Sequence, residues 1–286
     1  MGCLNDTVGF KHWFGNIHLS GPCNRKCYFC IGQHMMALDK FNVLDTWPLD
    51  GLDAFLKECN DLNVTEINLT GTNTDPLLYK HLGELRHYFK DYTLGIRTNA
   101  VLSNLEGLKY FDKGSITICS LDKEIYKKMM GHGEPPRLND ILDATQMWSD
   151  VKVNIVLGPE NCGPDNDIIK TIIDLKNAEY SNNQFTKINL REPYGQPHVG
   201  NPLMRLDWLK PACYTYGMPT YNIGGIMVTY WDVHYVEVES INLYANGNIS
   251  MTYPITKGYD DTGIVLDQTH FTGGRVREQW LNQNIN

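Results

Sequence analysis

Residues 21–33 read GPCNRKCYFCIGQ and place Cys23, Cys27 and Cys30 at the spacing C-x3-C-x2-C, directly after the short apolar run 17–19. Three thiols within eight residues, with no fourth beside them, are an unusual ligand set. A cubane of four irons accounts for it, because three irons are then anchored by the protein and one stays open for another ligand. The spacing therefore predicts a 4Fe-4S cluster whose missing thiol is the functional feature.

Two other interpretations of the cysteines stay open at this point. A structural zinc site normally takes four protein ligands, and the nearest fourth donors, His18 and His34, do not stand at a zinc-ribbon spacing. Three unrelated core cysteines at this spacing would be a coincidence, because free cysteines in cytosolic cores usually occur singly. Both interpretations are weaker than the iron-sulfur one.

Outward from the cysteines, the chain alternates between short β-rich runs and stretches with helical apolar spacing. Strands are expected at 16–20, 65–71, 93–101, 115–122, 151–158 and 186–193, and helices at 49–63, 76–91, 138–150 and 165–179. Repeated β-then-α units imply parallel strands joined by right-handed crossovers. Six units are too few for a full eight-stranded barrel, so we expect an α/β fold with a partial (β/α)6 TIM-like barrel, its ligands at the carboxyl ends of the strands.

The amino-acid composition of the chain changes after Pro202. The stretch 217–255 is rich in Tyr, Val and Ile and contains the turn Asn246-Gly247, which predicts a β-hairpin or a small sheet. We therefore expect a barrel domain at 14–205 and a β-rich extension at 206–286 that covers the substrate.

Tyr28, directly after the second cysteine, completes a resemblance to the radical S-adenosylmethionine (radical SAM) superfamily, whose signature is C-x3-C-x2-C with an aromatic residue at this place. The chain is closest in pattern to the branch of the molybdenum-cofactor cyclase and the peptide-modifying enzymes. The resemblance covers about 14–200. It implies that Cys23, Cys27 and Cys30 hold a 4Fe-4S cluster and that S-adenosylmethionine is the second cofactor.

The resemblance also implies cofactor contacts beyond the cysteines. Members carry a Gly-Gly-Glu-Pro-like turn after the second strand, which binds the methionine amino group; here the sequence is TGTNTDP, 70–76, and either Asn73 or Asp75 takes the acidic role. Without the cysteines, this turn would be an ordinary strand-to-helix loop with a cap before Pro76. The full set of cofactor-binding residues that the resemblance implies is Tyr28, Gly71, Thr72, Asn73, Asp75, Asn99, Ser120, Asp122 and Asn154.

Substrate contacts are expected where the chain departs from the family. The loop after the sixth strand offers Arg191, Tyr194 and His198, and a Gly-Gly turn near the C-terminus precedes Arg275 and Arg277. Backbone amides and guanidinium groups suit phosphate or carboxylate. A surface loop and a solvated helix start are the ordinary alternatives for these two stretches.

Composition limits the partners. The net charge is −8 with no block of Lys or Arg, so nucleic acid is disfavoured. No apolar run approaches the ~20 residues that span a bilayer and no signal core is visible, so we expect a cytoplasmic protein without a membrane partner.

The resemblance implies a radical SAM enzyme that reductively cleaves S-adenosylmethionine and abstracts hydrogen from a small, anionic or nucleotide-like substrate. It would take electrons from an external donor of the flavodoxin or ferredoxin type. A ribosomally made peptide is the alternative substrate, and a structural metal-binding protein is the alternative outside enzymes.

Overall fold

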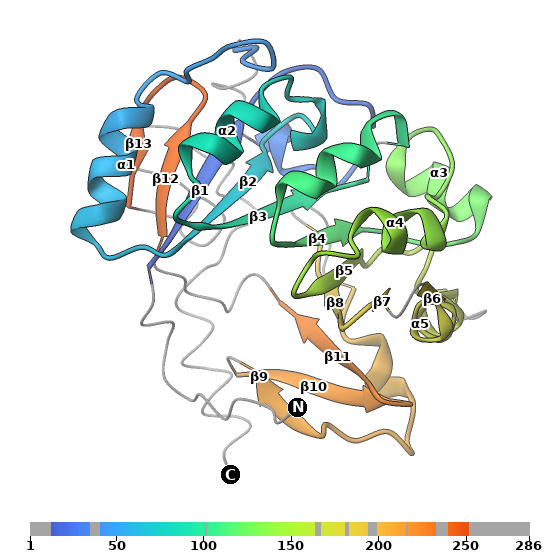
Figure 1. Ribbon diagram of the computed structural model, residues 1–286. Coiled ribbons are helices and arrows are strands. Elements are labelled where there is room, and N and C mark those ends of the chain that lie inside the picture. The colour runs from blue at the N-terminus through green and yellow to red at the C-terminus, as the bar shows by residue number, and fades with distance from the viewer. Residues whose placement is uncertain are drawn as a thin grey trace.

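The computed structural model describes residues 13–34, 41–100, 102–163, 167–180, 183–193, 199–215, 217–232 and 240–251. Within this part, one sheet of eleven strands runs in the order β13-β12-β1-β2-β3-β4-β5-β8-β11-β10-β9 (Figure 1). The strands are β1 (Phe14–Leu19), β2 (Glu66–Gly71), β3 (Thr93–Thr98), β4 (Lys113–Thr117), β5 (Val151–Val156), β8 (Lys187–Arg191), β9 (Cys213–Thr215), β10 (Met218–Ile223), β11 (Ile226–Trp231), β12 (Ser240–Tyr244) and β13 (Ile249–Ser250). A separate two-stranded hairpin joins β6 (Glu179–Tyr180) to β7 (Asn183–Gln184).

The central part of the sheet is parallel, as the β/α alternation predicts, but it is larger than expected. Eight strands, from β12 through β1 to β5 and on to β8 and β11, are parallel to their neighbours in the described residues. All six expected strands form, as β1 to β5 and β8, and β11 and β12, from the chain after residue 205, add two further parallel strands. These two strands join opposite ends of the same sheet, which the local sequence pattern does not reveal.

Antiparallel strands complete both edges. The Asn246-Gly247 turn forms as predicted, with Gly247 at φ 80° and β13 folded back on β12. At the other edge, β10 pairs antiparallel with β11 and with β9. The β-rich C-terminal strands therefore extend the central sheet instead of forming a sheet of their own.

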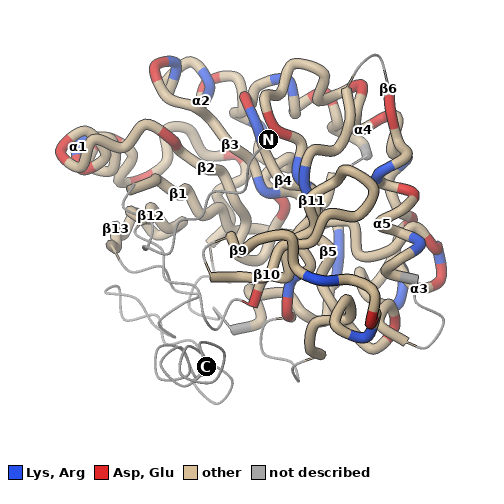
Figure 2. The backbone as a smooth tube through the Cα atoms, turned by 90° about the horizontal axis from the view of Figure 1, so that it is seen from below, with Lys and Arg blue, Asp and Glu red and all other residues tan. Residues whose placement is uncertain are grey.

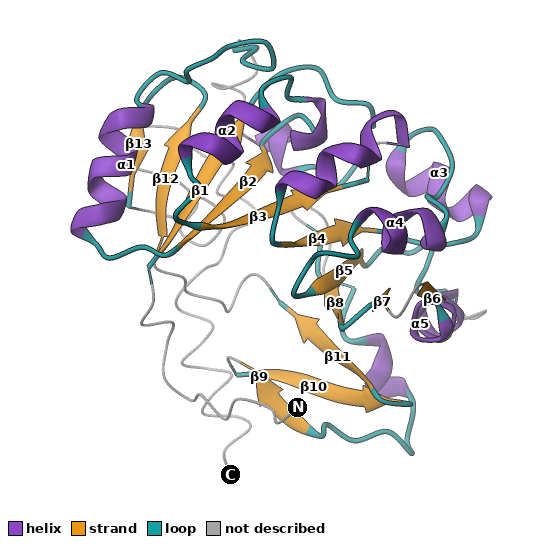
Figure 3. Cartoon of the chain, viewed as in Figure 1, coloured by secondary structure: helices purple, strands orange, loops and turns teal. Residues whose placement is uncertain are grey.

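Helices lie along the outer side of the curved sheet (Figures 1 and 3). They are α1 (Leu52–Asp61), α2 (Leu82–Tyr88), α3 (Lys123–Met130), α4 (Leu138–Ala144) and α5 (Asp167–Asn177), with short 3-10 turns η1 (Ile31–His34), η3 (Pro76–Leu78), η4 (Leu102–Tyr110) and η5 (Pro202–Arg205). Glycines let the layers meet closely. A Cβ on Gly15 would stand 2.9 Å from the Phe55 ring of α1, and one on Gly114 would stand 2.6 Å from Trp148. None of the described helices is long and apolar enough to cross a membrane.

Since side chains alternate along a strand, the residues between these helix-packed positions face the other side of the sheet, the helix-free face, which none of the described helices covers. In β1 these residues are Asn16 and His18, both buried. Asn16 donates to Oδ1 of Asn242 at 3.0 Å, and His18 Nε2 lies 3.1 Å from the same oxygen. The His18 ring stacks on Tyr244 at 4.9 Å. These contacts fasten β12 to β1.

We expect the stability of the protein to fall in mild acid because of His18. Burial, followed by the charge of Arg97, lowers the pKa of His18 from 6.5 to about 4, against a smaller opposing effect of its bond to Asn242. The unfolded chain then binds more protons between these values, so stability is lost as the pH falls through this window. The loss between pH 7.5 and pH 5 should be about 2 kcal/mol.

Urea unfolding at the two pH values measures this loss. His18→Gln should flatten the difference, whereas His132→Gln, at an exposed position, should retain it. An equal pH dependence in both variants would assign the acid sensitivity to other groups.

Candidate functional site

The cysteine loop leaves the carboxyl end of β1 and is held in place by α3. Lys26 N donates to Met130 O at 3.0 Å, and the left-handed Gly131 that ends α3 leaves no room for a side chain, because a Cβ would lie 2.6 Å from Lys26 O. Beneath the loop, a small apolar cluster contains Phe29, Cys119, Tyr126, Met129 and Met130. The loop is thus a packed part of the fold.

The three thiols have distinct surroundings. Cys27 Sγ lies 3.5 Å from the Met130 sulfur, Cys30 Sγ lies 3.7 Å from Thr72 O, and Cys23 is exposed. Although Cys23 as a whole is exposed, partial shielding of its thiol group from water raises the pKa of Cys23 to about 11, and the charges of Asp75 and Cys30 add to this shift. Burial also raises the pKa of Cys27, to which Cys119, Cys30 and Cys23 contribute. Without a cation, Cys23 and Cys27 stay protonated at neutral pH.

This arrangement fits an iron-sulfur core, whose own charge is positive before the thiolates are counted. The thiolates would repel one another, so iron that displaces their protons would compensate this repulsion. Within the part of the chain described, no three His, Cys, Asp or Glu side chains converge closely enough to hold a single metal ion; a cubane differs in that each thiolate binds its own iron.

Two buried polar atoms beside the loop also fit such a group. Among the described residues, Arg25 Nε and Tyr126 Oη have no hydrogen-bond partner, and the guanidinium of Arg25 lies 5.6 Å from the Tyr126 ring. Arg25 lies between the first two cysteines in the sequence, and its positive charge would offset part of the negative charge of a thiolate-bound cluster. Sequence reasoning did not select Arg25, although its position inside the three-cysteine motif was a signal.

The turn after β2 is locked against the cysteine loop. Thr72 N and Thr72 Oγ1 donate to Leu19 O at 2.9 and 3.1 Å, and Thr74 Oγ1 donates to Pro22 O at 2.8 Å. A Cβ on Gly71 would lie 1.8 Å from Thr74 O, and one on Gly32 would lie 2.6 Å from Thr72 O. Only glycine fits at these two positions, so the turn and the loop form one unit.

The two candidates for the acidic role in this turn are both engaged in holding it. Asn73 Oδ1 accepts from Ser20 Oγ at 2.8 Å and from Gly21 N at 3.1 Å. The buried Asp75 accepts from Leu77 N and Asn99 N and, with both oxygens, from Thr98 Oγ1, at 2.6–2.9 Å. Burial raises the pKa of Asp75, and these hydrogen bonds oppose the shift.

The turn is connected to the cysteine loop again through Asn99. Asn99 Nδ2 donates to Asn24 Oδ1 at 3.0 Å and Asn24 Nδ2 donates back at 3.3 Å. Asn24, the residue after Cys23, therefore connects the cysteine loop to the end of β3. Sequence reasoning did not select it. Tyr28 Oη donates to Glu160 Oε2 at 2.9 Å, which adds a carboxylate after β5 to the same region.

The remaining predicted cofactor residues lie in the turn after β4 and on the neighbouring strand β5. Since β4 ends at Thr117, Ser120 and Asp122 lie in the turn that follows: Ser120 Oγ accepts from Asp122 N, and Asp122 caps α3 by accepting from Glu124 N and Ile125 N. Asn154 on β5 accepts from Asn189 Nδ2 at 3.2 Å. The structure thus explains Asp122 as a helix cap and puts Asn154 on the helix-free face of the sheet.

The predicted substrate residues are described only in part. Arg191 is the last residue of β8. The next residue, Glu192, is buried and accepts from Val199 N, Gly200 N and Tyr230 Oη at 2.7–2.9 Å, which fastens the loop ends to β11. Tyr194, His198, Arg275 and Arg277 lie outside the described residues.

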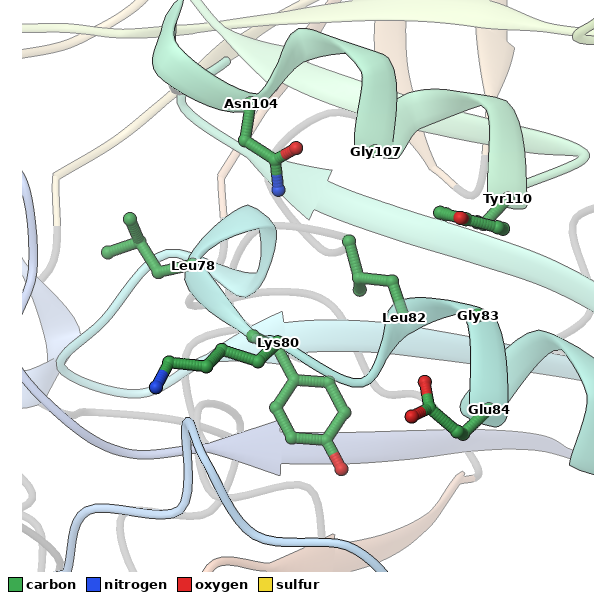
Figure 4. Close-up of a pocket in the computed structure, with 9 residues that line it drawn as sticks. Leu78, Lys80, Leu82, Gly83, Glu84, Asn104, Gly107 and Tyr110 are labelled. Carbon is green, nitrogen blue, oxygen red and sulfur yellow. The ribbon is translucent and has the colours of Figure 1, made fainter.

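A pocket of about 310 Å³ opens elsewhere, between η3, α2 and η4 (Figure 4). Its polar groups already have partners: Lys80 pairs with Asp45, Glu84 with His81, and Asn104 donates to Leu77 O. None of the predicted site residues lines it. The cysteine loop and the strand ends, not this pocket, carry the features that suit chemistry.

Comparison of the sequence finds no matching family model and no matching curated protein. Comparison of the structure finds SuiB of Streptococcus suis. Bound to its precursor peptide SuiA, it aligns with a TM-score of 0.54 at 15% identity over 93% of this chain and 67% of SuiB. Bound to S-adenosylmethionine, it aligns with a TM-score of 0.51 at 14% identity over 93% and 68%. The structural neighbours are radical SAM enzymes, and at these identities the likeness is one of fold.

Proposed function

We propose, from the fold that it shares with radical SAM enzymes, that this chain is itself a radical SAM enzyme. One observation carries the proposal: three thiols at C-x3-C-x2-C leave the first strand of a large parallel sheet on a loop packed against the turn after the second strand. A shared fold alone leaves function open. The thiol set on this fold supplies the site that the function needs.

In this proposal Cys23, Cys27 and Cys30 bind three irons of a 4Fe-4S cluster, and the fourth iron is left for S-adenosylmethionine. When both are bound, they supply a 5'-deoxyadenosyl radical that takes a hydrogen atom from the substrate. Met130 and the apolar cluster below the loop keep water from one side of the thiolates. Arg25 would balance part of the cluster's negative charge.

The cofactor would lie across the carboxyl ends of the parallel strands, which we propose form a partial TIM-type barrel. Contacts are proposed for Tyr28, Gly71, Thr72, Asn73, Asp75, Asn99, Ser120, Asp122 and Asn154. Asp75 and Asp122 would act mainly by holding the turn and α3 in place, because their oxygens accept backbone hydrogen bonds. Asn73 and Asn99 place amide groups just after β2 and β3, and Asn154 places one on β5.

For the substrate, two candidates have support. A small anionic molecule is favoured by the predicted arginines Arg191, Arg275 and Arg277. Tyr194 and His198 follow Arg191 in the same loop of the sequence. A ribosomally made peptide is favoured by the likeness to SuiB, which was solved with the precursor peptide SuiA. Residues 206–286 are proposed to cover the substrate, and a flavodoxin- or ferredoxin-type protein is proposed as the electron donor.

The test is formation of 5'-deoxyadenosine. The full chain, reconstituted anaerobically with iron and sulfide and given dithionite and S-adenosylmethionine, should release 5'-deoxyadenosine and methionine in equal amounts. Samples without dithionite are the control. A preparation that carries four irons and yet releases no 5'-deoxyadenosine would contradict the proposal, and a preparation that retains zinc instead of iron would favour the structural metal-binding alternative.

A further inference from the structure

The helix-free face of the sheet carries a row of cations deep below the strand ends. Paired positions across four parallel strands are Arg97, Ser115, Lys152 and Lys187. Lys113 lies on the same face of β4, two residues before Ser115. Figure 2, which views the molecule from below, shows Lys and Arg positions on the adjacent strands β4 and β5. Four cations are therefore gathered on one face of the sheet.

Two of these cations are neutralised by carboxylates at the amino ends of the strands. Lys113 forms an ion pair with Glu66, and Lys187 Nζ lies 3.7 Å from Asp150. Arg97 lies with its guanidinium carbon 5.9 Å from the Phe14 ring. Each of these three cations thus has a described contact.

Lys152 is different. It is half-buried, and within the described residues its ammonium group forms no hydrogen bond and no ion pair. Burial lowers the pKa of Lys152; among the charges, Asp150 acts most strongly and raises the pKa, whereas Lys187, Arg97 and Lys113 each lower it. The four cations of this face stand against the two carboxylates Glu66 and Asp150, so an excess of positive charge is left that an anion would offset.

We propose that the ammonium of Lys152, with Arg97 two strands away in the same row, binds an oxyanion of the substrate, a carboxylate or a phosphate. That the anion belongs to a substrate rests on the proposed function, but the anion site itself does not require the cluster. Lys152 lies two residues before Asn154 on the same face, which is about 6.6 Å along a strand. An anionic group held there would anchor a substrate whose other end reaches the strand ends above.

The geometry favours a small oxyanion over an extended polyanion. The row lies on the inner face of the sheet rather than on an outer surface, and its carboxylates Glu66 and Asp150 border it at the amino ends of the strands. A nucleic acid backbone needs a continuous exposed basic track. A single carboxylate or phosphate needs only one or two cations.

The experiment uses the full chain without cluster or S-adenosylmethionine, so that its outcome does not depend on radical chemistry. Lysine acylation, read by peptide mass spectrometry, is followed with inorganic phosphate, with succinate or with chloride of equal ionic strength. Phosphate or succinate should slow the acylation of Lys152 about tenfold, a size typical of a charge-assisted contact. Lys57, exposed and paired with Asp61, is the internal control and should not respond.

Protection by phosphate alone would identify a phosphate group, protection by succinate alone a carboxylate, and protection by both a general oxyanion site. Lys152→Met should bind the protecting anion about tenfold more weakly in calorimetry, and Lys152→Arg should restore binding. Absence of protection by either anion in the parent protein, or equal affinity in Lys152→Met, would overturn the inference. If the anion binds as expected while no 5'-deoxyadenosine forms, the site stands and the proposed function fails.

Discussion

Changing Cys23, Cys27 and Cys30 together to alanine is expected to reduce the iron content of the reconstituted protein from about four per chain to nearly none. The brown absorption of the cluster should disappear with it. The physical reason is that these thiols are the only sulfur ligands in the loop, and a cubane bound through fewer than three thiolates loses its anchors. Each single change should also lower the iron content strongly, because no neighbouring thiol in the loop can replace the missing one.

Cys59→Ala is the matched control, since Cys59 is a free cysteine buried in α1, away from the loop. It should retain iron and colour. The folded state of every variant is checked by far-ultraviolet circular dichroism, so that loss of the cluster is separated from loss of the fold. Iron content that survives the triple change would assign the cluster to other ligands.

Asp75→Ala is expected to lower the free energy of unfolding by about 4 kcal/mol or more. The reason is that several buried donors lose their acceptor, and each unsatisfied donor costs about 1–3 kcal/mol. The donors are Leu77 N, Thr98 Oγ1 and Asn99 N, all bonded to the Asp75 carboxylate. Water cannot replace the carboxylate there, since the side chain is only 3% exposed. The turn beside the cysteine loop should then lose its shape, and cofactor binding should fall as a consequence.

Asp122→Ala offers a matched comparison, because Asp122 also accepts two backbone N–H groups but lies in the open. Loss of this helix cap should cost about 1 kcal/mol. Urea unfolding of both variants measures the difference. If Asp75→Ala were as stable as the parent protein and still failed to bind S-adenosylmethionine, Asp75 would be a direct ligand of the cofactor instead of a support of the turn.

Much of the sheet could be predicted from local sequence patterns. Runs such as 151–156 and 187–191 form strands at the expected places, and Asn246-Gly247 forms the expected hairpin turn. The cysteine loop is also where the sequence puts it, directly after the first strand. These features depend on side-chain periodicity, turn residues and motif spacing, all of which act within a few residues of the chain.

Local sequence patterns could not predict which distant strands pair with each other. The strand β12 lies parallel to β1 although 226 residues separate Asn16 from its partner Asn242, and β11 joins the other end at β8. Neither partner is adjacent in sequence, and a parallel strand carries no turn that would identify its neighbour. The two additional parallel strands, β11 and β12, were missed for this reason.

The sequence by itself therefore determined the three-thiol loop, the β/α alternation and the small residues Gly32 and Gly71 on which the close packing of the loop depends. Only the tertiary structure decided that Asp75 reaches Thr98 and Asn99, that Asn24 pairs with Asn99, and that Lys152 lies in a row with Arg97 and Lys187. The physical reason is that motif spacing acts along the chain, whereas strand register and burial arise between segments that meet only after folding. These tertiary contacts determine which polar groups find partners within the protein and which are left for a ligand.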